Sequence, residues 1–359
     1  MVRRIGREVK KINKHTMNDL KQMSSLPLDI KINMSKRRIQ EWYEYWQGNV
    51  YVSFSGGKDS TVLKHIIDSM YVDVPAVFIN TGLEYPEIQH FVRNIKADKY
   101  SCFNTDVEIV TPKMPFNEVI KKYGYPVVSK EVSEIIDEAK KNISKGKKIP
   151  DYRMKKLNGQ LLDKNGNKSR YNCEKWKFLL DADFKISNKC CNIMKKLPIK
   201  TYEKESLRKP FIGTMAAESL LRQNAWIRYG CNSFVSSRPR SAPLSFWTEQ
   251  DILNYIIEYK VPYSSIYGNI IPIDEQISMI EIDKPKLKMS QRDRTGCMFC
   301  MFGCHLEKEP NRFQKLKASH PNVYNYCING GEYNEKGIWQ PSKEGLGIGH
   351  VLDFIGGKY

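Results

Sequence analysis

A glycine-rich segment near residue 55 combines residue types that bind phosphate. It reads Ser-Phe-Ser-Gly-Gly-Lys-Asp-Ser over residues 53–60 and lies between an apolar strand pattern and a helix pattern. Two glycines let the backbone N–H groups approach an anion closely, and the following helix start adds its dipole. It is not a Walker loop, because G-x-x-x-x-G-K-[ST] is absent. The residues expected to bind an anion such as phosphate are Ser53, Ser55, Gly56, Gly57, Lys58, Asp59 and Ser60.

Nine cysteines form the second group with chemical potential. An odd number without an export signal argues against a disulfide framework and favours a reducing compartment. Two close pairs stand out, Cys190-Cys191 and Cys297-x-x-Cys300. Four thiolates in two pairs can hold a tetrahedral four-sulfur site, which is either zinc or a [4Fe–4S] cluster. Spacing alone does not choose between the two.

The charge of the chain points to a polyanionic partner. The 359 residues carry a net charge of +18, and the isoelectric point is about 9.3. Residues 140–170 hold eleven Lys or Arg against two Asp, which is half of that net charge. This excess indicates nucleic acid, or otherwise an anionic small substrate. We read residues 140–170 as an exposed basic insertion or hairpin, which is either merely solvated or follows a polyanion.

The hydrophobic pattern predicts an α/β fold. Apolar runs at residues 50–54, 74–80 and 107–110 read as buried strands and alternate with helical patterns at 61–70 and 85–96. Such alternation is typical of a parallel sheet with helices on both faces, which is a Rossmann-like arrangement. No apolar run is long enough to span a membrane, and the basic N-terminus lacks the apolar core of a secretory signal. We therefore expect a cytoplasmic protein without a membrane partner.

The elements suggest three regions. Residues 1–34 are interpreted as a basic N-terminal arm, with a helix from Ser35 to about residue 47 after it. Residues 35–270 would form the nucleotide-binding α/β domain, which includes the basic insertion. Residues 271–359 would form a Cys-rich C-terminal region that completes the four-cysteine site. Helices are also expected at 218–228, at 247–259 with Thr248 as its N-cap, and at 310–319.

The phosphate loop resembles the PP-loop of the adenine nucleotide alpha hydrolase superfamily. The segment at 79–87 and the Pro243-Leu244 block at 243–263 resemble motifs of phosphoadenosine phosphosulfate (PAPS) and APS reductases. So does the segment at 211–222, in which Met215 replaces the usual Arg. The resemblance implies the adenine nucleotide alpha hydrolase type of Rossmann-like fold. The further residues that it implies in nucleotide binding are Asn80, Thr81, Gly82 and Gly213, with Arg222 as a phosphate clamp.

The cysteine arrangement resembles that of assimilatory APS reductases, in which a CC pair precedes a later C-x-x-C. By this resemblance Cys190, Cys191, Cys297 and Cys300 ligate a [4Fe–4S] cluster. Cys304 lies close enough in sequence to replace one of these ligands. Lys195 and its neighbours would place positive charge beside the anionic thiolates.

The reductase nucleophile is missing. In those enzymes a C-terminal cysteine in a motif like E-C-G-[IL]-H attacks sulfur, whereas no cysteine follows Cys327 in this chain. The chain is similar also to Dnd-type DNA phosphorothioation ATPases and to tRNA-thiolating enzymes, which hydrolyse ATP to AMP and pyrophosphate. Three hypotheses follow: a sulfur-transfer enzyme that activates a nucleic acid, a PAPS or APS reductase that uses an unusual cysteine such as Cys327, and a non-catalytic nucleotide- or nucleic-acid-binding regulator.

The leading hypothesis is ATP pyrophosphate cleavage that activates tRNA or DNA for sulfur transfer. Lys58 would stabilise the leaving pyrophosphate, Asp59 would orient Mg²⁺ and Arg222 would clamp phosphate. A sulfur donor protein would complete the reaction, whereas the reductase alternative needs PAPS or APS and a thioredoxin-like reductant.

Overall fold

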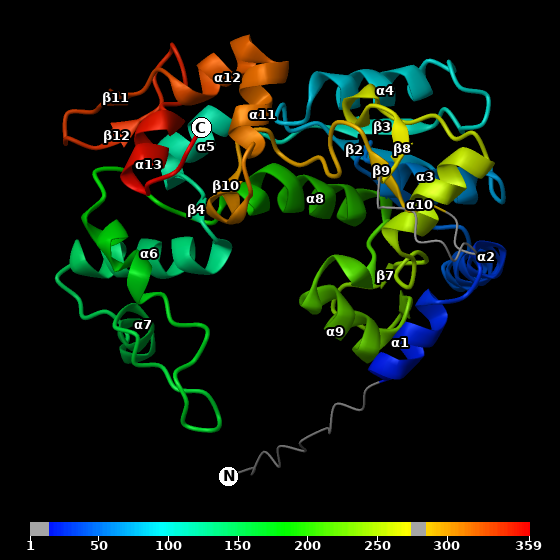
Figure 1. The fold of residues 1–359 in the computed structure, drawn as a ribbon, viewed down its shortest axis with the longest axis horizontal. Helices are drawn as coiled ribbons and strands as arrows, with labels where there is room; N and C mark the ends of the chain where they lie inside the picture. Colours follow the sequence, from blue (N-terminus) through cyan, green and yellow to red (C-terminus); the bar gives the residue numbers. More distant parts are fainter. Residues whose placement is uncertain (1–13, 274–284) are drawn as a thin grey trace. The chain divides into compact units, whose positions relative to one another are not determined.

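The computed structural model describes residues 14–273 and 285–359, which form two compact units (Figure 1). Unit 1 contains the described residues up to Ile79 and residues 85–110 and Thr201–Thr295. Unit 2 contains Asn80–Glu84, Thr111–Lys200 and Gly296–Tyr359. The phosphate loop belongs to unit 1, and the four predicted cluster ligands belong to unit 2.

A six-stranded sheet forms the centre of unit 1, with the strand order β3-β2-β1-β5-β7-β6. All neighbours in it are parallel except β6 and β7. The strands are β1 (Val50–Phe54), β2 (Ala76–Ile79), β3 (Val107–Val110), β5 (Lys209–Ile212), β6 (Asn232–Ser233) and β7 (Arg240–Ser241). β1 is apolar and buried along most of its length, as a central strand covered on both faces must be. The predicted parallel α/β sheet is thus confirmed.

Helices flank this sheet. The crossover from β1 to β2 runs through α3, and the crossover from β2 to β3 runs through α4. Because parallel crossovers are right-handed, both helices lie on the same face of the sheet. α8 covers the other face of β1, where Tyr51 donates a hydrogen bond of 2.9 Å to Glu203. The helices of unit 1 are α1 (Met17–Ser24), α2 (Leu28–Tyr45), α3 (Lys58–Asp68), α4 (Pro86–Lys96), the later part of α8 (Leu197–Ser206), α9 (Leu220–Tyr229) and α10 (Glu249–Glu258). A small hairpin of β8 (Ile270–Pro272) and β9 (Leu287–Met289) follows.

Unit 2 is mainly helical and has only two-stranded pairings in its described part. Its helices are α5 (Phe116–Tyr123), α6 (Lys130–Ile143), α7 (Asp151–Leu157), α11 (Arg312–Ser319), α12 (Pro321–Ile328) and α13 (Ile348–Phe354). Its strands are β4 (Val127–Val128), β10 (Met301–Phe302), β11 (Glu332–Tyr333) and β12 (Trp339–Gln340). The pairing of β4 with β10 brings segments 170 residues apart in sequence together, and this pairing positions the cysteines.

Two sequence-based expectations differ from the structure. The predicted helix start at Ser35 is wrong, because α2 begins at Leu28 after Pro27. Ser35 is buried and donates its hydroxyl to the Pro243 carbonyl at 3.0 Å, so it acts in packing rather than as a cap. The stretch 140–170 is partly helical, because it contains the end of α6 and all of α7, and only its later part has the expected hairpin form, closed by an antiparallel bridge between Leu162 and Lys168. Residues 1–13 of the predicted N-terminal arm and residues 274–284 of the predicted C-terminal region lie outside the described residues.

No helix among the described residues combines the length and the apolar character that a membrane crossing requires.

Candidate functional site

The phosphate loop lies where the strand order of the sheet reverses. β1 is flanked by β2 on one side and by β5 on the other, and the chain reaches β5 only after β3. In open α/β sheets such a switch point at the carboxyl ends of the strands is where ligands bind. Ser53 is the last-but-one residue of β1, in register with Val77 and Ile212. The other loop residues follow directly and end in the first turn of α3.

Two glycines allow the close packing of this loop. Gly56 has a φ of +69°, and a Cβ there would lie 2.8 Å from the Ile88 side chain. Gly213 follows β5, and a Cβ there would lie 3.0 Å from the Ser60 Cα. The ends of β1 and β5 therefore meet at the start of α3, which places Gly213 beside the phosphate loop.

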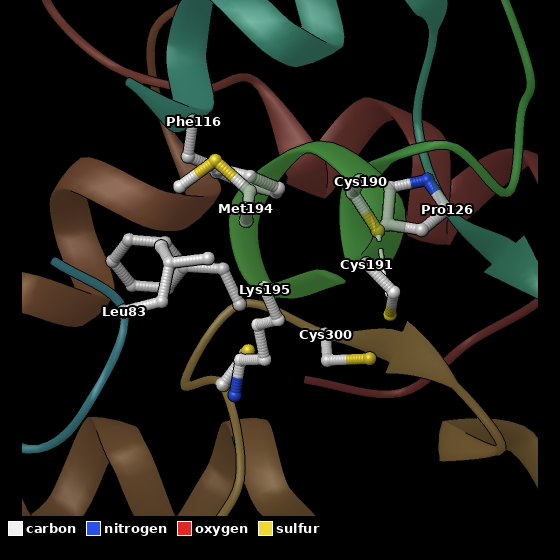
Figure 2. Close-up of a pocket in the computed structure, with 10 residues that line it drawn as sticks. Leu83, Phe116, Pro126, Cys190, Cys191, Met194, Lys195 and Cys300 are labelled. Atoms are coloured by element: carbon white, nitrogen blue, oxygen red, sulfur yellow. Dashed lines mark hydrogen bonds between the residues drawn. The ribbon is translucent and has the colours of Figure 1, made fainter. Parts of the chain in front are cut away.

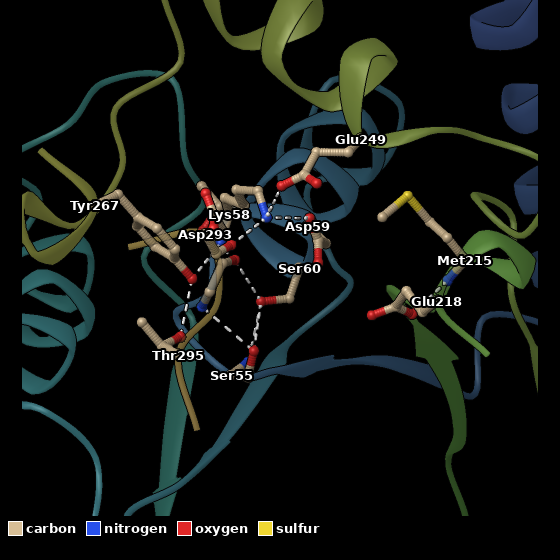
Figure 3. Close-up of polar contacts among 12 residues, drawn as sticks. Ser55, Lys58, Asp59, Ser60, Met215, Glu218, Glu249, Tyr267, Asp293 and Thr295 are labelled. Carbon is tan, nitrogen blue, oxygen red and sulfur yellow. Dashed lines mark hydrogen bonds and ion pairs between the residues drawn. The ribbon is translucent and has the colours of Figure 1, made fainter. Parts of the chain in front are cut away.

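Hydrogen bonds within the loop fix its shape (Figure 3). The hydroxyls of Ser55 and Ser60 lie 2.9 Å apart, and Ser60 donates to the Gly57 carbonyl at 2.9 Å. The Ser55 hydroxyl also accepts from the Gly57 N–H at 3.3 Å. Thr61 donates its hydroxyl to the same Gly57 carbonyl at 3.0 Å. The loop is thus preformed around the helix start that would receive an anion.

Lys58 is almost fully buried, with 4% of its side chain exposed. Its ammonium donates to the Asp293 carbonyl at 2.8 Å and pairs with Glu249 at 3.1 Å (Figure 3). Burial alone would lower the pKa of Lys58, but the neighbouring Asp59 and Glu249 carboxylates raise it overall. Lys58 therefore keeps its positive charge in the folded chain. Its backbone N–H donates to the Tyr267 hydroxyl at 3.2 Å.

Asp59 and Arg222 occupy the same electrostatic environment. Burial raises the pKa of Asp59, while Lys58 and Arg294 act in the opposite direction. The Asp59 Oδ1 atom is buried and accepts no hydrogen bond, although the Lys58 ammonium lies 3.6 Å away. Burial, followed by Arg294, lowers the pKa of Arg222. A carboxylate oxygen with spare acceptor capacity beside cationic side chains is a suitable ligand for a phosphate-bound Mg²⁺.

Arg222 lies in the first turns of α9 and forms an ion pair with Glu218. Glu218 also accepts from the Met215 N–H at 3.0 Å (Figure 3). Arg222, Met215 and Arg240 line a cavity of about 230 Å³ in unit 1. Met215 is 4% exposed, so the position that carries Arg in the resembled motif contributes an apolar wall.

Asn80, Thr81 and Gly82 follow β2 directly but cluster with unit 2. The Thr81 hydroxyl and N–H both donate to the Glu84 carboxylate at 2.8–2.9 Å, and the Gly82 N–H donates to the Asn80 side chain at 3.1 Å. Glu84 in turn pairs with Lys195 at 3.5 Å. Contacts within unit 2 therefore tie this predicted nucleotide-binding segment to the cysteine-bearing region.

All four predicted cluster ligands line one cavity of unit 2 (Figure 2). Cys190 and Cys191 come from the helical turn before α8, and their sulfur atoms lie 3.9 Å apart. Cys297 and Cys300 come from the turn before β10, which the Met298 N–H anchors to the Leu83 carbonyl at 2.8 Å. The other lining residues are mostly apolar: Leu83, Phe116, Pro126, Met194, Lys195 and Phe299.

The backbone after the cysteine pair widens into a π-helical turn at Asn192–Lys196. Pro198 follows and has no N–H with which to donate to the Met194 carbonyl, which favours a departure from regular α-helix. Single π-turns occur frequently at functional sites. This turn carries Lys195 and Met194, and both line the cysteine cavity.

The thiols share one electrostatic environment. Burial raises the pKa of Cys297 to about 11 and also raises that of Cys300. A hydrogen bond from Cys190 lowers the pKa of Cys191, assisted by Lys130 and Lys195. Burial would lower the pKa of Lys195, but Cys297 and Glu84 raise it, so Lys195 is a cation directed at the thiols.

Two further cysteines are placed differently from these four. Cys304 is buried but does not line the cysteine cavity. Cys327 is fully buried in α12, and burial raises its pKa strongly. A nucleophilic cysteine is accessible and has a lowered pKa, so Cys327 has the opposite properties. Within residues 14–273 and 285–359, no three His, Cys, Asp or Glu side chains form a group that could hold a metal ion as they lie.

Several residues at these sites were missed from the sequence. Tyr267, Asp293 and Thr295 contact the phosphate loop or its partners, since the Tyr267 hydroxyl lies 2.9 Å from Thr295. Glu249 pairs with Lys58 from the first turn of α10. The available signals were that Glu249 lies inside the 243–263 block and that Tyr267 follows it closely. Their approach to the loop depends on packing across about 190 residues or more.

Comparison with a family description gives a match to the phosphoadenosine phosphosulfate reductase domain. Two overlapping segments match, residues 49–160 and 129–302, which together cover more than half of the chain. A solved structure of phosphoadenylyl-sulfate reductase from Candida auris, a phosphate complex, aligns with 16% identity and a TM-score of 0.37. That alignment covers 70% of this chain and 90% of the reductase.

Curated proteins add three matches. Two uncharacterized proteins of Methanocaldococcus jannaschii are 24% and 23% identical over 313 and 296 residues, which are 84% and 81% of this chain. The matched regions are 48% and 50% of those proteins, so the chain spans about half the length of these curated relatives. Sulfate adenylyltransferase subunit 2 of Maricaulis maris is 32% identical over 88 residues, which are 21% of this chain and 29% of that protein.

Proposed function

Because the chain belongs to the phosphoadenosine phosphosulfate reductase family, we propose that it is a PP-loop enzyme that cleaves ATP to AMP and pyrophosphate and thereby activates a nucleic acid for sulfur transfer. The observation that carries this proposal is the preformed loop at the switch point of the sheet, with a buried, charged Lys58 at the start of α3. Such a site suits the β- and γ-phosphates of ATP.

Different residues of unit 1 have different proposed roles in binding the phosphates. The loop N–H groups and Lys58 stabilise the charge that develops on the departing pyrophosphate. Asp59 holds Mg²⁺ through its unpartnered Oδ1 atom. Arg222 and Arg294 add positive charge on the Asp59 side and would contact phosphate once Arg222 leaves its pair with Glu218.

The proposed reaction has two steps. An oxygen of the nucleic acid attacks the α-phosphorus of ATP, and the bond from that phosphorus to the bridging oxygen breaks. Pyrophosphate leaves with the electron pair of that bond. Sulfur from a sulfur donor protein then attacks the activated atom of the acceptor, which is a base carbon in tRNA or a backbone phosphorus in DNA, and AMP leaves with the former acceptor oxygen. No redox change is needed if the donor delivers sulfur at the sulfide level.

Charge supports nucleic acid, either tRNA or DNA, as the acceptor. The chain has a net charge of +18 in total, and half of it comes from residues 140–170. Those residues lie on α6, α7 and the turn after them, in the unit that also holds the cysteine cavity. Clustered cations are the electrostatic footprint of a protein that binds phosphate backbones.

We further propose that Cys190, Cys191, Cys297 and Cys300 hold a [4Fe–4S] cluster. The donor set fits, since four thiols line one mostly apolar cavity and Lys195 balances part of a thiolate charge. The free space among them is about 20 Å³, so the thiol side chains must turn away from one another when a cluster binds. When bound, the cluster would hold or relay the transferred sulfur or brace unit 2.

Sulfonucleotide reduction is the second candidate, and the family description favours it. It would use PAPS or APS with a thioredoxin-like reductant and would need a nucleophilic cysteine. Cys327 does not suit this role, because it is fully buried and burial raises its pKa. The third candidate, a non-catalytic regulator, does not need the buried lysine at the loop.

The test is anaerobic incubation of the purified protein with radiolabelled ATP, Mg²⁺ and inorganic sulfide as the sulfur source, with and without bulk tRNA or DNA, followed by chromatography for AMP and pyrophosphate. We expect AMP formation that one nucleic acid stimulates. Lys58→Ala should lower it at least about 100-fold, because a preorganised charge on the leaving group is lost. Lys96→Ala, at an exposed lysine of α4, is the matched control.

Other outcomes separate the candidates. Sulfite release from PAPS or APS with thioredoxin, without AMP from ATP, would establish the reductase. Nucleic-acid binding with neither product would favour the regulator. Unchanged AMP formation in Lys58→Ala, with unchanged circular dichroism, would refute the assignment of the loop as the active site.

A further inference from the structure

A second, larger cavity lies in unit 2 and is lined in part by the ends of β4 and β10. It measures about 540 Å³, within the range of cavities that hold drug-sized ligands. Three segments supply its walls: the start of α6, the loop before the helical turn at Glu174–Asp181, and the end of β10 with the turn after it. The lining includes the cations Lys130 and Arg170, one carboxylate, Glu131, which pairs with Lys156, and the rings of Tyr171, Trp176 and His305. We call this cavity the basic-aromatic pocket.

Cations and rings alternate along its rim. The Arg170 guanidinium lies 5.1 Å from the centre of the Tyr171 ring, and the Lys175 ammonium lies 5.2 Å from the Trp176 ring. Tyr171 is 51% exposed, so part of its ring remains free for a ligand. The pocket therefore offers an aromatic face and a positive charge side by side.

Deeper in the pocket the rings are held in place. Trp176 packs edge-on against His305 with ring centres 5.1 Å apart, and both belong to the lining. The His305 Nδ1 atom is buried and has no hydrogen-bond partner in the structure. Burial, followed by Lys175, lowers the pKa of His305, so its ring is neutral near pH 7. A neutral imidazole can donate to or accept from the edge of a base.

The same pattern continues outside the pocket. The Lys156 ammonium lies 4.9 Å from the Tyr152 ring and 5.7 Å from the Tyr171 ring. Tyr152 and Phe178 are 55% and 40% exposed, although each is large and partly apolar. Exposed rings interleaved with Lys and Arg characterise surfaces that bind single-stranded nucleic acid, where bases stack and phosphates pair with cations.

Three lining residues connect the pocket with the cysteine cavity. Lys130 lines the basic-aromatic pocket and is also an electrostatic neighbour of Cys191. Phe302 and Gly303 line it as well, two and three residues after Cys300, and the Gly303 N–H donates to the Val128 carbonyl at 2.8 Å. A ligand here would lie close to the proposed sulfur site.

We propose that the basic-aromatic pocket binds one unpaired nucleotide of a single-stranded nucleic-acid segment. Its base stacks on Tyr171 and Trp176, and its phosphates pair with Arg170 and Lys130. The inference rests on the proposed nucleic-acid acceptor and locates it: the strand runs over α7 and the basic stretch, and the pocket takes one base out of the stack. A paired duplex does not fit, because its bases present no free face.

The test measures binding of a short fluorescein-labelled single strand of mixed sequence, as RNA and as DNA, to the full chain by anisotropy at several salt concentrations without ATP. An abasic strand of the same length is the matched probe. Tyr171→Ala should weaken binding to the intact strand about tenfold and leave binding to the abasic strand unchanged. Tyr45→Ala, at a tyrosine 57% exposed in unit 1, should change neither.

Arg170→Gln tests the phosphate contact separately. It should weaken binding to both strands and reduce the slope of log affinity against log salt by about 0.7, the value for one phosphate contact on a single strand. Lys336→Gln, at an exposed lysine between β11 and β12, should leave the slope unchanged. Equal affinity of the wild-type chain for intact and abasic strands, or equal affinity of wild type and Tyr171→Ala for the intact strand, would overturn the proposal.

Failure of the pocket and failure of the proposed function give different results. AMP formation that a nucleic acid stimulates, with normal strand binding by a well-folded Tyr171→Ala chain, would overturn the pocket and keep the reaction. Base-dependent binding that Tyr171→Ala loses, without AMP from ATP, would keep the pocket and overturn the reaction.

Discussion

Single residues in this protein derive their chemistry from their neighbours. Lys58 and Asp59 are adjacent in sequence, yet Lys58 keeps its charge because carboxylates surround it, while burial favours the neutral form of Asp59. The Asp59 Oδ1 atom accepts no hydrogen bond from the described residues, although it pairs with the Lys58 ammonium at 3.6 Å. This spare acceptor capacity supports the proposal that Asp59 binds a divalent cation.

The pH dependence of stability should report Asp59. Its pKa is higher in the folded chain than its ordinary value of 3.8, so the folded chain binds the proton more tightly than the unfolded chain. The free energy of unfolding should fall as pH rises from 3.8 through the raised pKa. Asp59→Asn should lack this fall and exceed the wild type in stability at neutral pH, as measured by urea unfolding across the acidic and neutral range.

Magnesium should reverse that comparison. In the wild type, Mg²⁺ with a non-hydrolysable ATP analogue should raise the melting temperature, whereas Asp59→Asn should lose most of this gain. Asp29→Asn, at an exposed residue of α2, controls for loss of one charge. An equal increase in melting temperature with Mg²⁺ and the ATP analogue in the wild type and in Asp59→Asn would exclude Asp59 as a ligand.

The cysteines are tested by iron content. After anaerobic reconstitution, Cys297→Ser should lose the brown absorbance and most of about four irons per chain, because one of four ligands is removed. Cys102→Ser, at an exposed cysteine of unit 1, should keep both. Full iron content in Cys297→Ser would show that the ligand set is wrong, and Cys304 would be the next residue to replace.

At the scale of elements, two strand ends and one helix start form the phosphate site. β1 delivers the loop, β5 delivers Gly213, and α3 begins between them. The capping box of α10 places Glu249 in that helix's first turn: Thr248 accepts from the Asp251 N–H, and Asp251 accepts from the Thr248 N–H at 2.7 Å. The capping box, which depends only on neighbouring residues, thus positions Glu249 as a partner for Lys58 from a distant part of the chain.

Gly213→Ala should damage this junction. The added Cβ would lie 3.0 Å from the Ser60 Cα and 3.1 Å from the Ser60 nitrogen, and neither backbone atom can move without shifting α3. We expect a loss of about 1–3 kcal/mol in the free energy of unfolding and weaker binding of ATP. Gly296→Ala is the control, since a Cβ there meets no atom within 4 Å. Denaturant unfolding and ATP titration would measure both effects, and equal values for the two variants would contradict the close approach.

At the scale of the whole molecule, the two predicted sites belong to different compact units. The phosphate loop lies in unit 1, and the cysteine cavity and the basic-aromatic pocket lie in unit 2. Each unit is built from segments distant in sequence, so neither corresponds to one continuous stretch. The predicted boundaries at residues 34 and 270 remain proposals about how the chain folds in solution.

Ligands should therefore stabilise the units separately. A nucleotide at about 100 times its dissociation constant should add about 2.7 kcal/mol to the stability of the structure that binds it. By hydrogen exchange with mass spectrometry, ATP analogue should protect peptides of β1 and α3 most, and iron removal should expose peptides at 190–196 and 297–304 most. Equal changes in both sets for both treatments would show that the units do not respond separately.

The amino-acid sequence alone determined the features that depend on near neighbours. β1, the loop at residues 53–60 and β3 follow from apolar runs, glycines and a helix start within a few residues, and the structure has them as predicted. The capping box at Thr248 is equally local. The start of α2 was misjudged because Ser35, a good cap by type, is used instead to hydrogen-bond Pro243 and Trp247.

Tertiary structure alone decided which distant residues meet. Lys58 reaches the Asp293 carbonyl, Cys190 and Cys300 line one cavity, and Tyr171 faces the cavity that His305 helps to close. These pairs are separated by more than 100 residues, and no periodicity in the sequence records them. Their approach follows from packing the sheet, its crossovers and the β4–β10 pairing, where the burial of many side chains fixes the position of each one.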